Sequence, residues 1–224
     1  MAEFCSQMSH ELKTPLAIMR GECELILRSE GKPTEEYRDV IRLNLEEIIR
    51  MSKIIEDLVL LTKLEAQHGV VKFQEFDIVG FLREMTESIE ALAESKDLKH
   101  EIRLPSSPIR IKGDPVHLRK VFFSLVHNAV KFTPPGGHIL VEAVKKGKTV
   151  IISVSDTGIG ISAENQSRVF DKFFHFEKMS ELPPGNGLGL SIAQSIIKIH
   201  AGEVLLHSAT GKGSVFSVQL PVLR

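Results

Sequence analysis

The segment that decides the fold is Ser9-His10-Glu11-Leu12-Lys13-Thr14-Pro15, near the start of the chain. Apolar residues recur here every three or four positions, which predicts a helix with one buried stripe: Phe4, Met8, Leu12, Leu16 and Met19. His10 falls outside this stripe, so its ring is expected to face outward. Pro15 has no N–H to donate to the Glu11 carbonyl, so the helix can bend there. An exposed imidazole beside a carboxylate suits a nucleophilic histidine, although a lone His-Glu pair is more often a solvated surface feature.

Composition restricts the class of protein. The 224 residues are 42% hydrophobic, enough for a sizeable core, and the length favours one or two domains. A net charge of −1 and few aromatic residues argue against a nucleic acid or an anionic membrane as partner. Cys5 and Cys23 form neither a metal pattern nor a plausible disulfide, which favours a reducing compartment. No apolar run could span a bilayer and no signal peptide is present, yet the chain starts inside a helical pattern, so we expect a fragment with a segment upstream.

Two long helices are expected in the first third of the chain, at about residues 3–29 and 34–65. The break at Ser29–Thr34 contains a glycine and a proline, and the second helix keeps near-heptad apolar spacing. Long helices joined by a short turn form an antiparallel hairpin. Because one hairpin cannot cover both apolar stripes, we expect a homodimer that forms a four-helix bundle.

The rest of the chain mixes short strands with helices. The helical pattern breaks at Gln67-His68-Gly69, so the predicted domains are residues 1–66 and 70–224. Strands are expected at 70–73, 100–104, 109–112, 138–145, 149–155, 203–208 and 213–220. Helices are expected from the cap Asp77, from Asp114-Pro115 to Lys131, and from Gly187 to Ala201. The fold class is therefore multidomain: an all-α antiparallel hairpin, then an α+β two-layer sandwich.

Asn128 and Lys131 lie three residues apart, on one face of a predicted helix. An amide oxygen suits Mg²⁺, which prefers hard oxygen ligands, and a lysine can reach a phosphate as a point charge. Taken alone, the pair is equally consistent with capping and solvation at a helix end.

The segment Asp156-Thr157-Gly158-Ile159-Gly160 follows a predicted strand. A carboxylate at a strand end can accept from an exocyclic amine such as adenine N6, and glycines let the backbone approach a flat ring. The same residues also suit an ordinary β-turn. Asp-Thr-Gly would fit an aspartic protease, but the chain is short and has no second such triad.

The run Gly185-Asn186-Gly187-Leu188-Gly189 opens directly into a predicted helix, where free N–H groups favour a phosphate. It is neither a Rossmann loop nor a Walker A loop, because Leu190 and Gly213 stand where those patterns need glycine and Ser or Thr. Upstream, Phe170–Phe174 begins an irregular stretch. Its phenylalanines can anchor a lid formed by Phe173–Pro184, or they are an ordinary hydrophobic contact for a loop.

The order of these motifs resembles the sensor histidine kinases of two-component systems. It runs from His-Glu-x-x-x-Pro and a helical hairpin through Asn-Ala-x-Lys-Phe-Thr-Pro and Asp-x-Gly-x-Gly to a Phe-rich box and Gly-x-Gly-Leu-Gly-Leu. The resemblance covers nearly the whole chain, and the second half is similar to the ATP-binding fold of gyrase and mismatch-repair ATPases. It implies that residues 1–66 serve dimerisation and phosphotransfer, and that residues 70–224 bind ATP and catalyse.

The resemblance also implies roles. His10 would be the phospho-accepting nucleophile, Glu11 its general base, and Thr14 a residue used in dephosphorylating the partner. Asn128 would hold Mg²⁺, Lys131 the phosphates, and Asp156 the adenine amine. The implied nucleotide pocket is completed by Gly158, Gly160, Phe173, Gly185, Gly187, Leu188 and Gly189.

Three positions depart from the family pattern: Ser124 replaces a second asparagine, His175 a frequent arginine, and Ser214 a common threonine. A zinc peptidase is excluded because His-Glu-x-x-His needs a histidine where Thr14 stands. A non-catalytic dimeric ATP-binding scaffold that engages a response regulator is the alternative function. An ATPase of the gyrase kind would leave His10 unexplained.

The expected reaction is ATP-dependent autophosphorylation of His10, followed by transfer to an aspartate of a response regulator receiver domain. Regulator phosphatase activity is expected as well. The Gln67–Val70 linker is the expected hinge. The expected location is the cytoplasm, with a full-length protein held in the inner membrane of a bacterium through the missing upstream segment.

Overall fold

The computed structural model describes residues 2–28, 33–66, 71–174 and 186–223. The chain divides into two compact units, Met1–Thr62 and Lys63–Arg224. The turn at 29–32 and the expected hinge at 67–70 lie outside the described residues. No helix in the described ranges combines the length and apolar character that crossing a membrane requires.

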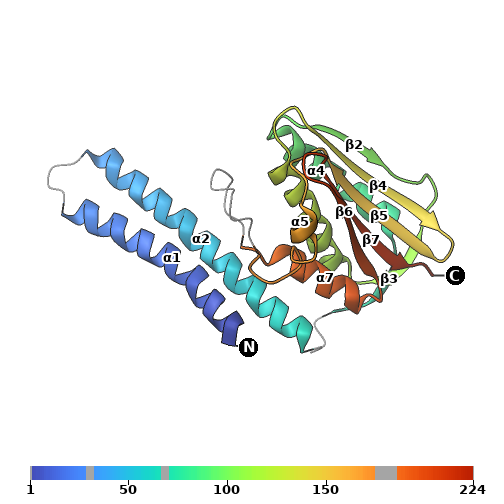
Figure 1. Ribbon diagram of the computed structural model, residues 1–224, viewed down its shortest axis with the longest axis horizontal. Helices are drawn as coiled ribbons and strands as arrows, with labels where there is room; N and C mark the ends of the chain where they lie inside the picture. The colour runs from blue at the N-terminus through green and yellow to red at the C-terminus, as the bar shows by residue number, and fades with distance from the viewer. Residues whose placement is uncertain (1, 29–32, 67–70, 175–185, 224) are drawn as a thin grey trace. The chain divides into compact units, whose positions relative to one another are not determined.

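Helices α1 (Ala2–Leu27) and α2 (Thr34–Glu65) form the predicted hairpin (Figure 1). Glu35 and Glu36 occupy the first turn of α2, where their negative charge interacts favourably with the positive end of the helix dipole. The side-chain amide of Asn44 donates to Cys23 Sγ at 3.1 Å and so links the two helices. α1 runs through Pro15 without interruption.

The predicted buried stripe on α1 is only partly covered. Met8, Leu12 and Met19 are half-buried, but Leu16 is 51% exposed and Pro15 is buried instead. The side chain of Phe4 lies outside the described residues. Exposure continues along both helices at Ile18, Leu25, Leu27, Tyr37, Ile41, Leu45, Ile48, Ile49 and Ile55. The prediction was wrong for Leu16 in the single chain because one hairpin leaves much of the apolar surface of its two helices uncovered.

The second unit is an α+β sandwich built on a five-stranded mixed sheet. The strands are β2 (Lys99–Arg103), β4 (His138–Lys146), β5 (Thr149–Asp156), β7 (Ser214–Pro221) and β6 (Glu203–Ser208), in that spatial order. β2 pairs with β4 in parallel, and the other neighbours are antiparallel. The last residue of β5, Asp156, lies opposite Ser214, and Ser214 lies opposite Ser208, so these three residues form a row across the sheet.

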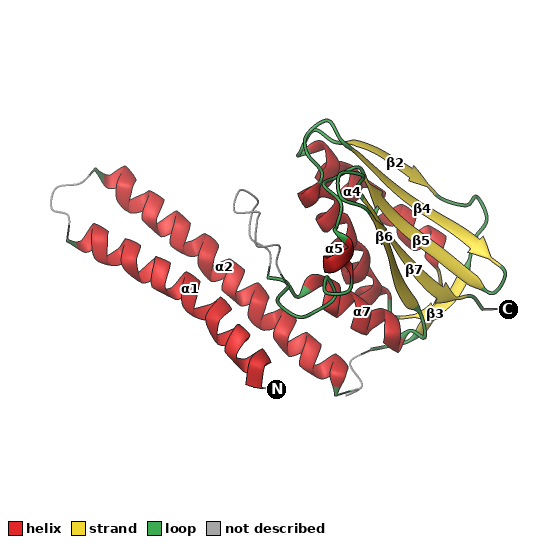
Figure 2. Cartoon of the chain, in the orientation of Figure 1, coloured by secondary structure: helices red, strands yellow, loops and turns green. Residues whose placement is uncertain are grey.

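The helices of this unit are α3 (Ile78–Glu84), α4 (Thr86–Glu94), α5 (Pro115–Phe132), α6 (Ala163–Gln166) and α7 (Gly189–Ile199). Figure 2 shows α4, α5 and α7 on one face of the large sheet. In the three central strands, β4, β5 and β7, alternate residues are buried toward that layer: Ile139, Val141, Ala143, Val150, Ile152, Val154, Phe216, Val218 and Leu220. This period of two is what a sheet with one covered face requires.

The expectation of a strand at 70–73 was wrong for residues 71–73, because the strand begins just after them, in a separate two-stranded sheet. β1 runs from Gln74 to Asp77 and pairs antiparallel with β3 (Arg110–Gly113). Just before it, the backbone N–H of Lys72 donates to the Asp114 carboxylate at 2.7 Å, so this part of the chain is held by a side chain and not by a strand partner.

The predicted helix after Asp77 is also interrupted. Asp77 caps α3 by accepting from the N–H groups of Val79 and Gly80, as predicted. The chain then turns at the fully buried Met85 and continues as α4. Apolar spacing alone does not reveal this break, because Met85 fits the buried face of either helix.

Candidate functional site

His10 is an exposed side chain in the middle of α1. The Thr14 hydroxyl donates to the His10 backbone carbonyl at 3.2 Å, one helical turn away. Glu11 is half-buried, and Pro15, the first proline of the chain, is buried. The helix therefore holds the imidazole in solvent with a carboxylate next to it in the chain and a hydroxyl within one turn.

Asp156 ends β5 with one carboxylate oxygen fixed by the backbone. Its Oδ1 accepts from the N–H groups of Gly158 at 2.8 Å and Ser214 at 3.2 Å. Burial raises the pKa of Asp156 above its ordinary value, and the two N–H donors offset part of this effect. Within the described ranges no group donates to Oδ2, so this oxygen is left to accept from a ligand such as an exocyclic amine.

The glycines after Asp156 are required by close packing. A Cβ on Gly158 would collide with the Phe132 carbonyl at the end of α5. Gly160 has φ +67°, and a Cβ there would collide with the Ala209 carbonyl. The loop is thus pressed between α5 and the β6–β7 turn, which brings the aspartate motif to the end of the helix that carries Asn128.

Asn128 and Lys131 lie on α5, half-exposed, near its C-terminal end. The Asn128 amide makes no hydrogen bond with a described residue, so its oxygen remains an available hard ligand. The Lys131 ammonium lies 5.2 Å from the Phe132 ring centroid. Lys96, which the sequence did not single out, donates to the carbonyls of Val130 and Lys131 at 2.9 and 2.7 Å and caps the helix.

The glycine loop opens α7 against the same helix. A Cβ on Gly189 would lie 2.7 Å from Ser124 Oγ, so the loop touches α5 one turn before Asn128. Gly187 has φ +62°, Leu188 is fully buried, and the Leu188 N–H donates to the Asn186 side chain at 3.2 Å. Gly185 lies outside the described residues.

The Phe-rich box, Phe170–Phe174, packs into the core and also contacts the glycine loop. Phe173 is 8% exposed, and its N–H donates to the Gly187 carbonyl at 3.0 Å. Phe170 stacks edge-on against Phe216 of the sheet with ring centroids 6.3 Å apart. The predicted lid is described only at Phe173 and Phe174, and residues 175–184, including His175, lie outside the described residues.

Two polar side chains brace the aspartate loop without having been predicted from the sequence. The Ser208 hydroxyl accepts from the Ile161 N–H at 2.8 Å and donates to the Gly213 carbonyl at 2.7 Å. The Gln166 amide donates to the carbonyls of Ile161 and Ser208 at 3.0 and 2.9 Å. No sequence pattern marks either residue, because their partners lie up to 47 residues away.

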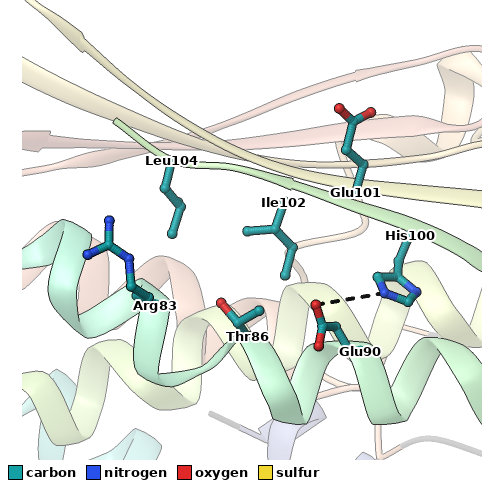
Figure 3. A pocket seen from close by; sticks show the side chains of 7 residues that line it. All are labelled: Arg83, Thr86, Glu90, His100, Glu101, Ile102 and Leu104. Atoms are coloured by element: carbon teal, nitrogen blue, oxygen red, sulfur yellow. Dashed lines mark ion pairs between the residues drawn. The ribbon is translucent and has the colours of Figure 1, made fainter. Parts of the chain in front are cut away.

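A shallow groove of about 510 Å³ lies apart from these motifs, between α4 and the edge strand β2 (Figure 3). Figure 3 shows Ile102 and Leu104 pointing from the strand toward the helix, while Glu101 points away. Glu90 and His100 approach to 3.9 Å across it. None of the predicted site residues lines this groove.

Comparison with known proteins gives the family. Residues 1–67 match the His Kinase A (phospho-acceptor) domain, and residues 113–224 match the histidine kinase-, DNA gyrase B- and HSP90-like ATPase domain. The chain belongs to the sensor histidine kinases, and its second unit carries the ATP-binding domain of that family.

Curated relatives agree. The chain is 31% identical over 222 residues to the signal transduction histidine-protein kinase ArlS of Staphylococcus epidermidis, covering 99% of this chain and 48% of the relative. It is 34% identical over 217 residues to ArlS of Staphylococcus aureus, covering 96% of this chain and 48% of the relative. The chain thus spans about half the length of the curated relatives it matches.

Solved structures share the fold. Full-length ShkA in complex with AMPPNP is 27% identical, with a TM-score of 0.73 over 98% of this chain and 46% of that chain. The histidine kinase AdeS of Acinetobacter baumannii is 23% identical, with a TM-score of 0.75 over 96% of this chain and 98% of that chain. The histidine kinase ThkA in complex with the response regulator TrrA is 24% identical, with a TM-score of 0.77 over 99% of this chain and 61% of that chain.

Proposed function

We propose that this chain is the catalytic core of a protein-histidine autokinase that phosphorylates His10 and passes the phosphoryl group to an aspartate of a response regulator. One observation carries the proposal: the Asp156 loop, the glycine loop and the Asn128–Lys131 face lie along the C-terminal half of α5. These motifs are far apart in the sequence, and together they offer an amine acceptor, the N-terminus of α7, an amide oxygen and a cation. That set fits an adenine nucleotide with its phosphates.

The base and the phosphates are bound by different elements. Asp156 Oδ2 accepts from the adenine amine, and Gly158 and Gly160 allow the ring to approach the backbone. The N-terminus of α7, which follows Gly187 and Leu188, favours the triphosphate. Lys131, on α5, supplies a positive charge for the phosphates. Gly185 and the Phe173 end of the lid complete the binding segment.

Asn128 fits the requirements of a magnesium ligand. Its amide oxygen is hard, half-exposed and not used by another described group. When bound, Mg²⁺ neutralises charge on the phosphate oxygens. Calorimetry of Asn128→Ala tests this role, because the variant should lose Mg-ATP binding while Asn165→Ala, another half-exposed asparagine of the same unit, keeps it.

The transfer step uses the first unit. Glu11 accepts the proton of the His10 imidazole, and the ring nitrogen attacks the γ-phosphate in line with the leaving oxygen. The N–P bond forms as the P–O bond to ADP breaks. The resulting phosphoramidate is labile, so the phosphoryl group can pass to a receiver aspartate. Thr14, whose exposed hydroxyl lies one turn from His10, assists dephosphorylation of the regulator, in which water attacks the aspartyl phosphate and inorganic phosphate leaves.

The biological unit is proposed to be a homodimer. The exposed apolar side chains of α1 and α2 are the surface that a second hairpin would cover in a four-helix bundle. The functional domains are proposed as residues 1–66 and 70–224, joined by the hinge at Gln67–Val70. The longer protein is proposed to be anchored in a bacterial inner membrane by a segment upstream, with this part in the cytoplasm.

Incubation of the purified chain with magnesium and ATP labelled at the γ-phosphate tests the proposed activity. The expected product carries a label that is lost in acid and kept in base, as a phosphohistidine requires. A chain that binds ATP and forms dimers but never gains the label would instead be the non-catalytic scaffold.

A further inference from the structure

We propose that Ser208 is a positioning residue that fixes the orientation of Asp156 and thereby sets the preference of the site for adenine over guanine. This inference rests on the proposed ATP-binding function. It concerns a residue that touches neither of the two carboxylate oxygens of Asp156 directly.

The argument begins with the row of three residues at the ends of neighbouring strands. Asp156 ends β5, Ser214 begins β7 opposite it, and Ser208 ends β6 opposite Ser214. The Ser214 N–H donates to Asp156 Oδ1 at 3.2 Å. Oδ1 is held from two sides, by this N–H and by the Gly158 N–H at 2.8 Å, so the outward direction of Oδ2 depends on both segments keeping their positions.

The Ser208 hydroxyl fixes the position of Ser214 and of the loop before it. Its single proton goes to the Gly213 carbonyl at 2.7 Å, so the 3.0 Å contact with Ser214 Oγ has the Ser214 hydroxyl as donor. The same oxygen accepts from the Ile161 N–H at 2.8 Å. One side chain thus joins the loop that follows Asp156 to the loop that precedes Ser214.

Removal of this hydroxyl would leave two part-buried backbone groups, the Ile161 N–H and the Gly213 carbonyl, without their partner. The two loops would then be joined less tightly, and the 3.2 Å bond from the Ser214 N–H to Oδ1 would lengthen while the Gly158 N–H stayed in place. A carboxylate held from one side only has more freedom to rotate about that contact, so it presents Oδ2 to a less fixed point.

Base preference follows from that orientation. Adenine offers an amine donor at position 6, whereas guanine offers a carbonyl oxygen there. A fixed carboxylate oxygen accepts a hydrogen bond from the adenine amine and repels the guanine carbonyl oxygen. It therefore favours ATP and disfavours GTP. A loosened carboxylate does neither well, so the ratio of the two affinities should fall.

The experiment measures dissociation constants for ATP and GTP by calorimetry on the whole chain. In Ser208→Ala the constant for ATP should rise about tenfold while that for GTP changes less than about twofold, because only the adenine contact is lost. Ser208→Thr, which restores the hydroxyl, should recover most of the preference. Ser153→Ala is the matched control, since that hydroxyl is paired with Ser217 at 2.9 Å elsewhere in the same sheet.

The possible outcomes distinguish a failure of the role proposed for Ser208 from a failure of the proposed ATP-binding function. A wild-type chain that does not bind ATP defeats the proposed function itself. A wild-type chain that binds ATP, with Ser208→Ala keeping the wild-type ATP-to-GTP ratio or weakening both nucleotides equally, overturns the role of Ser208. If Ser208→Ala does not fold, Ser208→Cys is compared instead, because a thiol occupies the same place but is a weak donor and acceptor, and an unchanged ratio there overturns the proposal too.

Discussion

The backbone N–H of Phe173 donates to the carbonyl of Gly187 at 3.0 Å, which joins the two ends of the segment between the Phe-rich box and the glycine loop. Both residues have left-handed backbone angles, with φ of +60° and +62°. Gly187 adopts this conformation without strain, whereas Phe173 is held in it by burial of its ring. The base of the proposed lid is therefore a fixed point beside the start of α7.

Gly187→Ala should weaken both the fold and nucleotide binding. A left-handed alanine costs about 1–2 kcal/mol of unfolding free energy, and relief of that strain would displace the carbonyl that Phe173 uses. Chemical unfolding and ATP calorimetry measure the two effects. Gly147→Ala is the control, because Gly147 has φ +61° in the β4–β5 turn with open space around its Cβ position. Equal loss of ATP affinity in both variants would contradict the assignment.

Gly189 and Ser124 should be energetically coupled. The Cβ of Gly189→Ala would lie 2.7 Å from Ser124 Oγ, so the hydroxyl must rotate or the loop must shift. Ser124→Ala removes the conflict, and the double variant should be more stable than the sum of the single variants by about 0.5–1 kcal/mol. Additive unfolding free energies would show that the glycine loop does not press on α5 at this point.

Asp156→Asn should stabilise the fold at neutral pH and abolish ATP binding. Burial raises the pKa of Asp156, so the folded state bears a cost for the charged form that grows as the pH rises above the ordinary value of about 3.9. An asparagine oxygen can still accept from Gly158 and Ser214, but its amide would face the adenine amine donor to donor. Thermal unfolding at several pH values should show an advantage at pH 7 that disappears in acid. A less stable variant at pH 7, or one that binds ATP normally, would be the contrary result.

His200 should make the second unit less stable in mild acid. Its Nε2 accepts from the Asp114 N–H at 2.9 Å and its Nδ1 lies 2.7 Å from the Ile196 carbonyl, so the ring is neutral with its proton on Nδ1. Burial lowers the pKa of His200, and the hydrogen bond to the Ile196 carbonyl and the Asp114 carboxylate offset only part of this effect. As the pH falls, the histidine is protonated in the unfolded chain before it is protonated in the folded chain. The free energy of unfolding therefore falls as the pH drops below about 6.5, the ordinary pKa of histidine, toward the lower pKa of the folded state.

Chemical unfolding between pH 7.5 and 5, in steps of about half a unit, tests the histidine. His200→Gln keeps an acceptor for the Asp114 N–H but does not titrate, so its stability should fall less steeply with acid than that of the wild type. An identical slope in the two proteins would show that His200 is not the source of the acid sensitivity.

Local patterns predicted much of this fold. Helix α2 has the expected bounds, and Asp77 and Asp114 cap α3 and α5 as their sequence contexts indicated, because a cap depends on residues two or three positions away. The β4–β5 and β6–β7 hairpins also fall where alternation and turn residues placed them. These features involve short sequence separations, at which residue type largely decides conformation.

Contacts over long separations could not be predicted in the same way. The parallel pairing of β2 with β4, the cap that Lys96 supplies to α5 and the Ser208 brace each join segments tens of residues apart. The strand expected at 70–73 was misplaced because its partner, β3, fixes where pairing starts. Convergence of the Asp156 loop and the glycine loop on α5 likewise depended on the resemblance to a family, since neither motif alone indicates the other.

The central claim is that His10 accepts the phosphoryl group, and the most direct measurement is label incorporation in matched histidine variants. With magnesium and γ-labelled ATP, wild type and His207→Ala, which alters another exposed histidine, should gain an acid-labile label. His10→Ala should gain none while its calorimetric affinity for ATP stays unchanged. Label retained on His10→Ala, or a wild-type chain that binds ATP and is never labelled, would contradict the account.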